Sequence, residues 1–222
     1  ASEGQRLAVD IPQPERATLG GAIATNVSGP RRYGLGTLRD YVIGISAVDA
    51  RGRAFKAGGR VVKNVAGYDL CKLLVGSLGS LALITQVTLK LKPLPETSAL
   101  YWLPVADLEV ADRLLAGMVS SRTRPVALEL LSEATASSIA RQTNIQVRAN
   151  SPVLVIGMEG ARSEVQWQLE VLAAELESRD STLARSYIGD DALPLWSALT
   201  DYQVASEEPA SIKANILPSK VT

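Results

Sequence analysis

The sequence predicts an α+β protein with two domains, residues 1–97 and residues 98–222. One observation is the distribution of glycine, since most of the 17 glycines lie before residue 80. Another is the stretch LKPLPETSA at residues 91–99, where two prolines close an apolar run that neither can continue. A third is the regular exchange of strands and helices beyond this stretch. We therefore place the domain boundary there.

Strands dominate the first domain. Residues 6–11 alternate weakly, as in a short strand, and residues 41–59 form two apolar runs around a turn at Arg51 and Gly52, which is typical of a hairpin. Residues 81–93 alternate as a strand with one wet side. The side chains expected on one face of that strand are Leu83, Thr85, Val87, Leu89 and Leu91.

A helix is predicted in this domain at residues 69–77. Leu70, Leu73 and Leu74 have helical spacing, and the carboxylate of Asp69 suits a helix start. Cys71 lies in this segment and is expected to be a core residue.

The second domain alternates between strands and helices. The strands are expected at residues 98–105, 126–132, 153–160 and 211–218. One helix follows Asp107, with an apolar face of Leu108, Ala111, Leu114, Leu115 and Met118. Another has a capping-box pattern, Ser163 with Gln166, and an apolar face of Val165, Leu169, Leu172, Ala173 and Leu176. This order is that of a ferredoxin-like α+β sandwich with helices on one face.

The overall composition excludes several classes of protein. The 222 residues are 46% hydrophobic, enough for a buried core, and 23 basic residues balance 23 acidic ones. That balance gives no field that would attract nucleic acid or an anionic membrane. No apolar run is long enough to span a bilayer and no signal-peptide order is present, so we expect a soluble, cytoplasmic protein.

Cysteine and histidine are scarce. Cys71 is the only cysteine and there is no histidine. The sequence therefore excludes an internal disulfide, a Cys-rich metal site and a Ser-His-Asp triad within these residues, and we predict no metal and assign no catalytic residue.

The stretch ATLGGAIATNVSGPRRYG at residues 17–34 has two interpretations. Gly20 and Gly21 are costly in a helix, so something approaches the backbone closely there. If Thr18 begins a helix, free amide groups at its start would suit a phosphate, with Arg31 or Arg32 neutralising the charge. Tight packing between helices with solvated arginines is the alternative. The P-loop motif is absent, and GLGTLR at residues 34–39 lacks the third glycine of a dinucleotide fingerprint.

Three segments in order resemble one family. They are EGQRLAVDIPQP (residues 3–14), ATLGGAIATNVSGPRRYGLGTLRDYVIG (residues 17–44) and GGRVVKNVAGYDLCKLLVGSLGSLALITQVTLKLKP (residues 58–93). Their order and spacing are similar to FAD-dependent 2-hydroxyacid oxidoreductases of the vanillyl-alcohol oxidase superfamily, especially the FAD-binding subunits of glycolate oxidases and then the D-lactate dehydrogenases. The resemblance implies the C-terminal half of a PCMH-type FAD-binding domain, followed by part of a ferredoxin-like cap domain.

The resemblance also implies the cofactor, FAD, and the residues that contact it. The FAD pyrophosphate and ribityl chain would pass along Thr18, Leu19, Gly20, Gly21, Thr25, Asn26, Ser28 and Gly29. The flavin or adenine side would meet the backbone around Gly79, Leu81 and Ile84. Asp40 falls on a family motif, with flavin contact and local bracing as competing roles. Two departures stand out, since Leu78 replaces the family's acid and Ala82 replaces a glycine.

The implied activity is hydride transfer from a short 2-hydroxy acid to FAD. Family members often use a histidine for the acid-base step, and this sequence has none. A non-catalytic flavin-binding or assembly subunit is therefore the alternative. The expected partners are a second flavin subunit and an iron-sulfur subunit, which could bring the chain to the inner face of the membrane. Both chain ends look cut, so a piece of a longer protein is expected, and the fragment alone is expected to be inactive.

Overall fold

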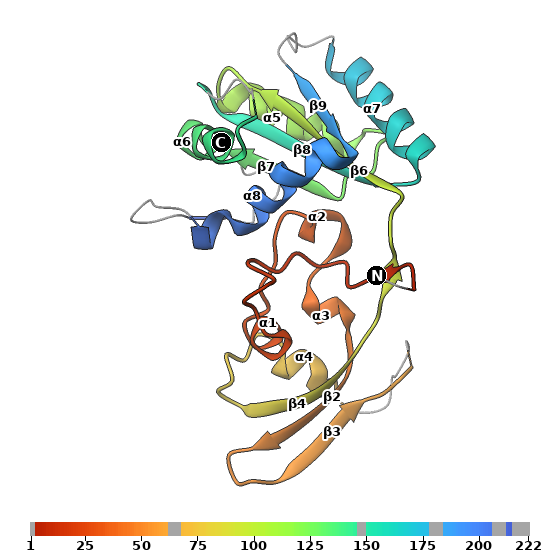
Figure 1. The fold of residues 1–222 in the computed structure, drawn as a ribbon, viewed down its shortest axis with the longest axis vertical. Coiled ribbons are helices and arrows are strands. Elements are labelled where there is room, and N and C mark those ends of the chain that lie inside the picture. Colours follow the sequence, from red (N-terminus) through yellow and green to blue (C-terminus); the bar gives the residue numbers. More distant parts are fainter. Residues whose placement is uncertain (1–2, 62–67, 146–149, 178–183, 206–211, 215–222) are drawn as a thin grey trace. The chain divides into compact units, whose positions relative to one another are not determined.

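The structure confirms the mixed α+β class. The computed structural model describes residues 3–61, 68–145, 150–177, 184–205 and 212–214. The chain divides into two compact units, Ala1–Leu94 and Pro95–Thr222, and each has its own strands and helices (Figure 1). Within the described part, no helix is long and apolar enough to cross a membrane.

Short helices and antiparallel strands alternate in the first unit. The strands are β1 (Gln5–Arg6), β2 (Val42–Asp49), β3 (Ala54–Gly58), β4 (Ala82–Leu89) and β5 (Lys92–Pro93). The helices are α1 (Leu19–Thr25), α2 (Arg32–Leu35), α3 (Leu38–Tyr41) and α4 (Leu70–Leu74). One sheet has the order β3-β2-β4, and β1 pairs separately with β5.

The predicted hairpin is confirmed. β2 pairs with β3, and Gly52 lies in the turn with a φ of 75°, a conformation that glycine adopts at no steric cost. The carboxylate of Asp49 holds this turn, because Oδ1 accepts hydrogen bonds from the backbone N–H groups of Arg51 and Arg53, each at 2.9 Å.

A β-bulge changes the predicted face of β4. Ser46 pairs with Gln86 and Ala47 pairs with Ile84, which leaves Thr85 as the extra residue. A bulge of this kind reverses the alternation of side chains along a strand. The inner face therefore changes at Thr85, and Leu83, expected on one face with Val87 and Leu89, is 71% exposed while the other two pack on the core.

The predicted strand at residues 6–11 was wrong for most of its length. Only Gln5 and Arg6 pair, with Pro93 and Lys92 of β5. Beyond Arg6 the chain is held by packing and side-chain bonds and not by a ladder, since Ala8 and Asp10 are buried although they form no strand.

Two predicted helix starts are confirmed by their caps. The Asp69 carboxylate accepts a hydrogen bond from the N–H of Lys72 at 3.1 Å, and that of Asp107 accepts one from Val110 at 2.8 Å. Such caps satisfy amides that the helix itself cannot. The helix after Asp69 is shorter than predicted, because Val75 already has an extended conformation.

The core of the first unit lies where α1, α3 and α4 meet the inner face of the β3-β2-β4 sheet. Its buried members are Ala22, Ile23, Leu38, Val42, Ile45, Ala47, Cys71, Leu74, Val75 and Ala82.

The second unit is built on one antiparallel sheet with the strand order β7-β8-β6-β9. Its strands are β6 (Thr97–Pro104), β7 (Ala127–Leu131), β8 (Val153–Gly160) and β9 (Arg185–Ile188). Its helices are α5 (Leu108–Val119), α6 (Glu133–Thr143), α7 (Arg162–Glu177), the 3-10 turn η1 (Gly189–Ala192) and α8 (Leu193–Ala205).

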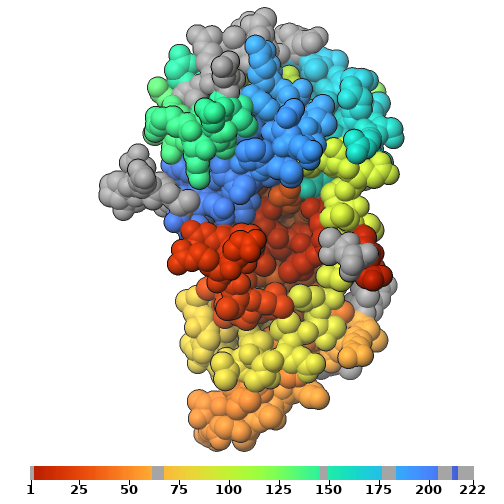
Figure 2. Space-filling view, viewed as in Figure 1, coloured from red at the N-terminus to blue at the C-terminus, as the bar shows by residue number. Residues whose placement is uncertain are grey.

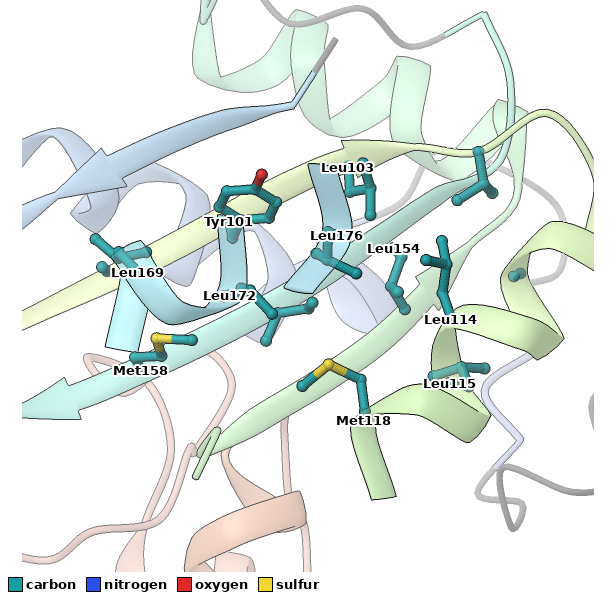
Figure 3. Close-up of a cluster of buried hydrophobic side chains, with 14 of the residues drawn as sticks. Tyr101, Leu103, Leu114, Leu115, Met118, Leu154, Met158, Leu169, Leu172 and Leu176 are labelled. Atoms are coloured by element: carbon teal, nitrogen blue, oxygen red, sulfur yellow. The ribbon is translucent and has the colours of Figure 1, made fainter. Parts of the chain in front are cut away.

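One face of this sheet carries α5 and α7, as expected. Alternate residues of β6 and β8, such as Tyr101 and Met158, meet Leu114 and Met118 of α5 and Leu172 of α7 in a buried cluster (Figure 3). The predicted apolar faces of both helices are largely confirmed. Leu108 is an exception because it lies half-exposed at the first position of α5.

The expectation of helices on one face only was wrong. Gly157 of β8 lies under the Trp196 ring of α8, so close that a Cβ at position 157 would overlap it. Trp102 and Leu195 are fully buried, and α6 packs beside α8. α6 and α8 therefore cover the opposite face. Their sequences lack a strong apolar stripe, and this is why the pattern did not predict them.

Two details of the second unit also differ from expectation. Ser163 is not a cap, since α7 begins at Arg162 and the carboxylate of Glu96 accepts the N–H of that residue at 3.1 Å. The fourth strand of the sheet is β9. The strand expected at residues 211–218 falls mostly outside the described residues, and residues 212–214 form no strand.

Candidate functional site

The helix α1 is fixed at both ends by its own residues. At the start, the side chain of Thr18 accepts a hydrogen bond from the N–H of Gly21 at 3.1 Å. At the end, Asn26 adopts the left-handed conformation with a φ of 52°, and its N–H bonds to carbonyls of the last turn. Thr25 adds a bond from its hydroxyl to the carbonyl of Gly21 at 2.9 Å. The expected Thr18 start is confirmed.

Gly20 and Gly21 differ in what surrounds them. A Cβ on Gly21 would lie 2.9 Å from the Thr18 hydroxyl, so the helix cap accounts for that glycine. A Cβ on Gly20 would meet no atom within 4 Å. Packing within the described residues therefore does not require glycine at position 20, although glycine costs about 1 kcal/mol there relative to alanine.

A turn after α4 lies against the end of α1. The N–H of Gly76 donates to the carbonyl of Ile23 at 3.0 Å, and the N–H of Leu78 donates to the carbonyl of Ala24 at 2.8 Å. On the surface of the first unit, the red-orange residues of α1 lie beside the golden residues near position 75 (Figure 2). The structure thus brings the first predicted FAD segment next to the turn that leads into the second, which begins at Gly79.

Positive φ angles shape this turn. Gly76 and Gly79 have φ values of 82° and 73°, and Leu78 between them has 54°. For a bulky residue this left-handed conformation is an outlier. Leu78 is also 75% exposed, so burial of its side chain does not compensate for the strain.

Two buried oxygen atoms have no hydrogen-bond partner among the described residues at this junction. They are Oδ1 of Asn26 and Oγ of Ser77. Asn26 also lies in van der Waals range of Gly76, since a Cβ there would be 3.4 Å from that of Asn26. Buried acceptors without partners are costly, so a hydroxyl or water is expected to satisfy them.

The loop after α1 is held from within the first unit. Asp10, 8% exposed, accepts hydrogen bonds from the N–H of Arg31 at 2.7 Å and from its guanidinium at 2.6 Å. Gly29 packs directly on Asp10, since a Cβ at position 29 would lie 2.6 Å from the Asp10 Cβ. Ser28 receives a longer contact, 3.5 Å, from Arg32. Sequence reasoning missed Asp10, because nothing near it in the chain indicates its partner.

Asp40 has a structural partner. Its carboxylate accepts a hydrogen bond from the N–H of Thr37 at 2.8 Å and contacts the Thr37 hydroxyl at 3.2 Å, as in a capping box. Gly36 makes room for it, because a Cβ on Gly36 would lie 2.7 Å from the carboxylate. Of the two roles considered for Asp40, these contacts favour local bracing.

The remaining predicted contacts are Leu19 on α1, and Leu81 and Ile84 just before or on β4. Leu81 is half-exposed just before the strand, and Leu19 is similarly exposed at the start of α1. Ile84 packs its side chain against the core of the first unit and pairs with Ala47 of β2, so its side chain is not free to contact a ligand.

A polar cleft of about 500 Å³ lies on the first unit beside α4. Arg39, Lys56 and Lys90 line it, and sequence reasoning assigned these residues no role. Cys71 lies at its edge and is buried, with its thiol 3.6 Å from the carbonyl of Ala57. Burial, and then the charge of Asp69, raise the pKa of this thiol above its ordinary value. Such a thiol is protonated and unreactive near neutral pH.

The donors and acceptors around α1 and the turn after α4 suit a long polar ligand. Among the described residues, no group of three or more His, Cys, Asp or Glu side chains could hold a metal ion. The first amides of α1 have no intrahelical acceptor, the backbone at Gly20 is open, and Asn26 and Ser77 can accept hydroxyl donors. These features fit a molecule that carries both phosphate and hydroxyl groups, such as FAD.

Comparison with known families supports the same cofactor. Residues 1–58 match the family described as FAD binding domain. The chain is 33% identical to "Glycolate oxidase subunit GlcD" of Bacillus subtilis over 166 residues, which is 74% of this chain and 35% of that protein. The resemblance to FAD-linked oxidoreductases is confirmed.

Two more relatives match shorter parts of the chain. It is 44% identical to "Glycolate oxidase subunit GlcE" of Escherichia coli over 98 residues, 44% of this chain and 28% of that protein. It is 42% identical to "D-lactate dehydrogenase" of Archaeoglobus fulgidus over 120 residues, 54% of this chain and 27% of that protein. The chain thus spans about a third of the length of these relatives.

A solved structure shares the fold. It is "alkyldihydroxyacetonephosphate synthase in P1", with a TM-score of 0.64 and 19% identity, and the match covers 91% of this chain and 40% of that one. At this identity the likeness concerns the fold alone.

Proposed function

We propose that the protein carrying this sequence is an FAD-linked oxidoreductase of short 2-hydroxy acids, of the glycolate or D-lactate type. The observation that carries the proposal is the open space around the backbone of Gly20. This glycine stands in a helix without any packing requirement and in the segment that matches an FAD-binding family, and the other end of the same helix bonds to a second glycine-rich turn. An approaching cofactor supplies the reason for the bare backbone.

In this proposal the first unit binds the cofactor through two segments. The amides at the start of α1 meet the phosphates, as at other helix starts that bind anions. Asn26, Ser28 and Ser77 offer side-chain oxygens to hydroxyl groups, and Gly79 and Leu81 offer backbone and apolar contact. Bound FAD would supply the hydride acceptor for oxidation of the substrate alcohol.

The test uses the protein that carries these residues, purified with FAD and kept free of oxygen. Glycolate, D-lactate and, as a control, acetate are added in turn. Loss of the visible flavin absorbance with a 2-hydroxy acid but not with acetate supports the proposal. Protein that retains no FAD, or flavin that no 2-hydroxy acid reduces, contradicts it.

A second candidate is a non-catalytic flavin-binding or assembly subunit. It is favoured by Leu78, which stands where the family has an acid, and by the similarity to a protein named as one subunit of glycolate oxidase. The partners would be a second flavin subunit and an iron-sulfur subunit, in a cytoplasmic complex that could lie against the membrane. Flavin reduction by substrate only after the partner subunits are added would favour this candidate. Reduction in the isolated protein would exclude it.

A further inference from the structure

The cleft beside α4 collects more positive than negative side chains. Its charged lining residues are the basic Arg39, Lys56, Lys72 and Lys90 and the acidic Asp40 and Asp69. The basic residues come from α3, β3, α4 and the end of β4, so only the folded unit brings them to one place. Because the whole chain has equal numbers of basic and acidic residues, this local excess is a property of the cleft.

Both carboxylates of the cleft are already engaged. Oδ2 of Asp40 accepts the N–H of Thr37 at 2.8 Å and lies 3.2 Å from its hydroxyl. Asp69 accepts the N–H of Lys72 at 3.1 Å, and its other oxygen lies 3.4 Å from the ammonium of that residue. Asp69 therefore compensates Lys72. The other three cations of the cleft have no carboxylate partner within the part of the chain that the structure describes.

The buried residue Tyr41 places one of these cations. The N–H of Lys90 donates to the Tyr41 carbonyl at 2.8 Å, and the Lys90 ammonium lies 5.3 Å from the centre of the Tyr41 ring. Tyr41 is only 1% exposed, and its hydroxyl donates to the carbonyl of Leu35 at 2.9 Å. The same short helix, α3, carries Arg39. A cation that is held in place before binding loses less conformational entropy when an anion arrives.

The cleft is larger than a simple anion needs. Its volume of about 500 Å³ lies within the range of pockets that hold small organic ligands. Val42, Val61 and Leu70 add apolar walls to the charged lining. A molecule with one strongly anionic end and an apolar body therefore matches the lining better than a bare ion.

We propose that this cleft binds a small organic phosphate. A phosphate monoester carries close to two negative charges on one group near neutral pH, so it can pair with both Arg39 and Lys90, whereas a carboxylate brings one charge. Of the residues expected to contact FAD, only Asp40 lines the cleft, and its carboxylate already braces α3. The proposal therefore adds a site to the FAD surface at α1 and does not depend on it.

The first experiment measures the binding of three probes by calorimetry, in the protein that carries these residues. The probes are phenyl phosphate, inorganic phosphate and benzoate. Phenyl phosphate should bind most tightly, because inorganic phosphate lacks the apolar body and benzoate has the same ring with a single charge. Its affinity should fall as the salt concentration rises, since exposed charges are screened. An affinity for phenyl phosphate no higher than that for inorganic phosphate or benzoate overturns the proposal.

The second experiment uses variants of the cleft. Arg39→Gln and Lys90→Gln should each weaken phenyl phosphate binding roughly tenfold, because each removes one charge-assisted contact. Lys92→Gln is the control, since Lys92 lies in β5 and does not line the cleft, and it should bind as wild type. Arg39 is exposed, so R39Q should fold even if K90Q loses stability with its contact to Tyr41. Unchanged affinity in R39Q, or an equal loss in K92Q, overturns the proposal.

Competition separates this cleft from the cofactor surface. Phenyl phosphate is titrated again into protein saturated with FAD, and we expect the same affinity as without FAD. Loss of phenyl phosphate binding in the presence of FAD assigns the cleft to the cofactor and overturns the proposal of a further site. Phenyl phosphate binding that depends on Arg39, in protein that binds no FAD, supports the further site and contradicts only the proposed function.

Discussion

The N–H of Gly76 donates a hydrogen bond to the carbonyl of Ile23 at 3.0 Å. This bond and that from Leu78 to Ala24 join the end of α1 to a turn that lies far along the chain. A ligand that approaches α1 therefore finds the turn beside it. These backbone bonds bring the turn that leads into the second segment assigned to FAD by the resemblance against the end of the first.

Leu78→Gly should stabilise the protein. Leu78 is held at a φ of 54° with its side chain exposed, and a left-handed conformation costs a residue with a Cβ about 1–2 kcal/mol. Glycine loses part of this gain through the greater entropy of its unfolded chain, so we expect an increase of roughly 0.5–1 kcal/mol in the free energy of unfolding. Urea unfolding measures it.

The control for this variant is Gly79→Ala in the same turn. Gly79 has a φ of 73° and open space around it, so the substitution adds only backbone strain, at a cost of about 1 kcal/mol. Stabilisation by G79A, or destabilisation by L78G, would show that the turn does not have the backbone described above.

Local chemistry could be predicted from the sequence where one residue decides it. Thr18, Asp69 and Asp107 begin helices because their side chains accept nearby amides, and Gly52 turns the hairpin. The β4 bulge could not be predicted, since its register depends on the neighbouring strand. The positions of α6 and α8 could not be predicted either. These helices are buried against one face of a sheet, and that face exists only once strands distant in the sequence have paired.

The candidate site divides in the same way. The glycine-rich stretch was visible as bare backbone, but its partner turn was assigned only through the family resemblance. The role of Asp10 is set by Arg31 and Gly29, and no local pattern indicates that contact. Which of Arg31 and Arg32 remains exposed is equally a property of the tertiary structure.

Gly157→Ala should destabilise the second unit. A methyl group there would overlap the Trp196 ring and lie 3.0 Å from the Cβ of Ala127, so the closely packed interior has to move. Overpacking of this kind costs about 1–3 kcal/mol. Thermal unfolding measures the loss. Trp196→Phe makes a smaller ring, and G157A should cost less in that background; equal cost in both backgrounds would contradict the proximity of α8 to this face.

Cys71 should make the stability of the first unit depend on pH in the alkaline range. Its folded pKa is raised, first by burial and then by Asp69, above an ordinary value of 9.0. The folded state therefore holds the thiol proton more tightly than the unfolded state, and this contribution is present below pH 9 and is lost as the pH rises through the folded pKa. The difference in free energy of unfolding between wild type and Cys71→Ala should fall above about pH 9.

The thiol reagent reaction gives an independent check on Cys71. In the folded protein the thiol should react slowly near neutral pH. Its reaction rate should begin to rise at a higher pH than the rate measured for the unfolded chain. A thiol that reacts at neutral pH as fast as in the unfolded chain would contradict both its burial and the direction of its pKa.

Gly20→Ala should increase stability slightly. A Cβ at this position meets no atom within 4 Å, and alanine is better than glycine in a helix by about 1 kcal/mol. Gly59→Ala is the control, since Gly59 also has open space but lies outside α1 and should not gain helix stability. Loss of stability in G20A would mean that an atom of the folded chain lies where the structure shows none.

The FAD affinity of wild type and Gly20→Ala is the measurement that tests the central claim most directly. Flavin fluorescence is followed while FAD is titrated into the protein that carries these residues, and unfolding of both proteins is measured in parallel. We predict that wild type binds FAD and that G20A binds it more weakly although it is at least as stable. Wild-type protein that ignores FAD, or G20A that binds it with unchanged affinity, would contradict the claim that the bare backbone of α1 holds the cofactor.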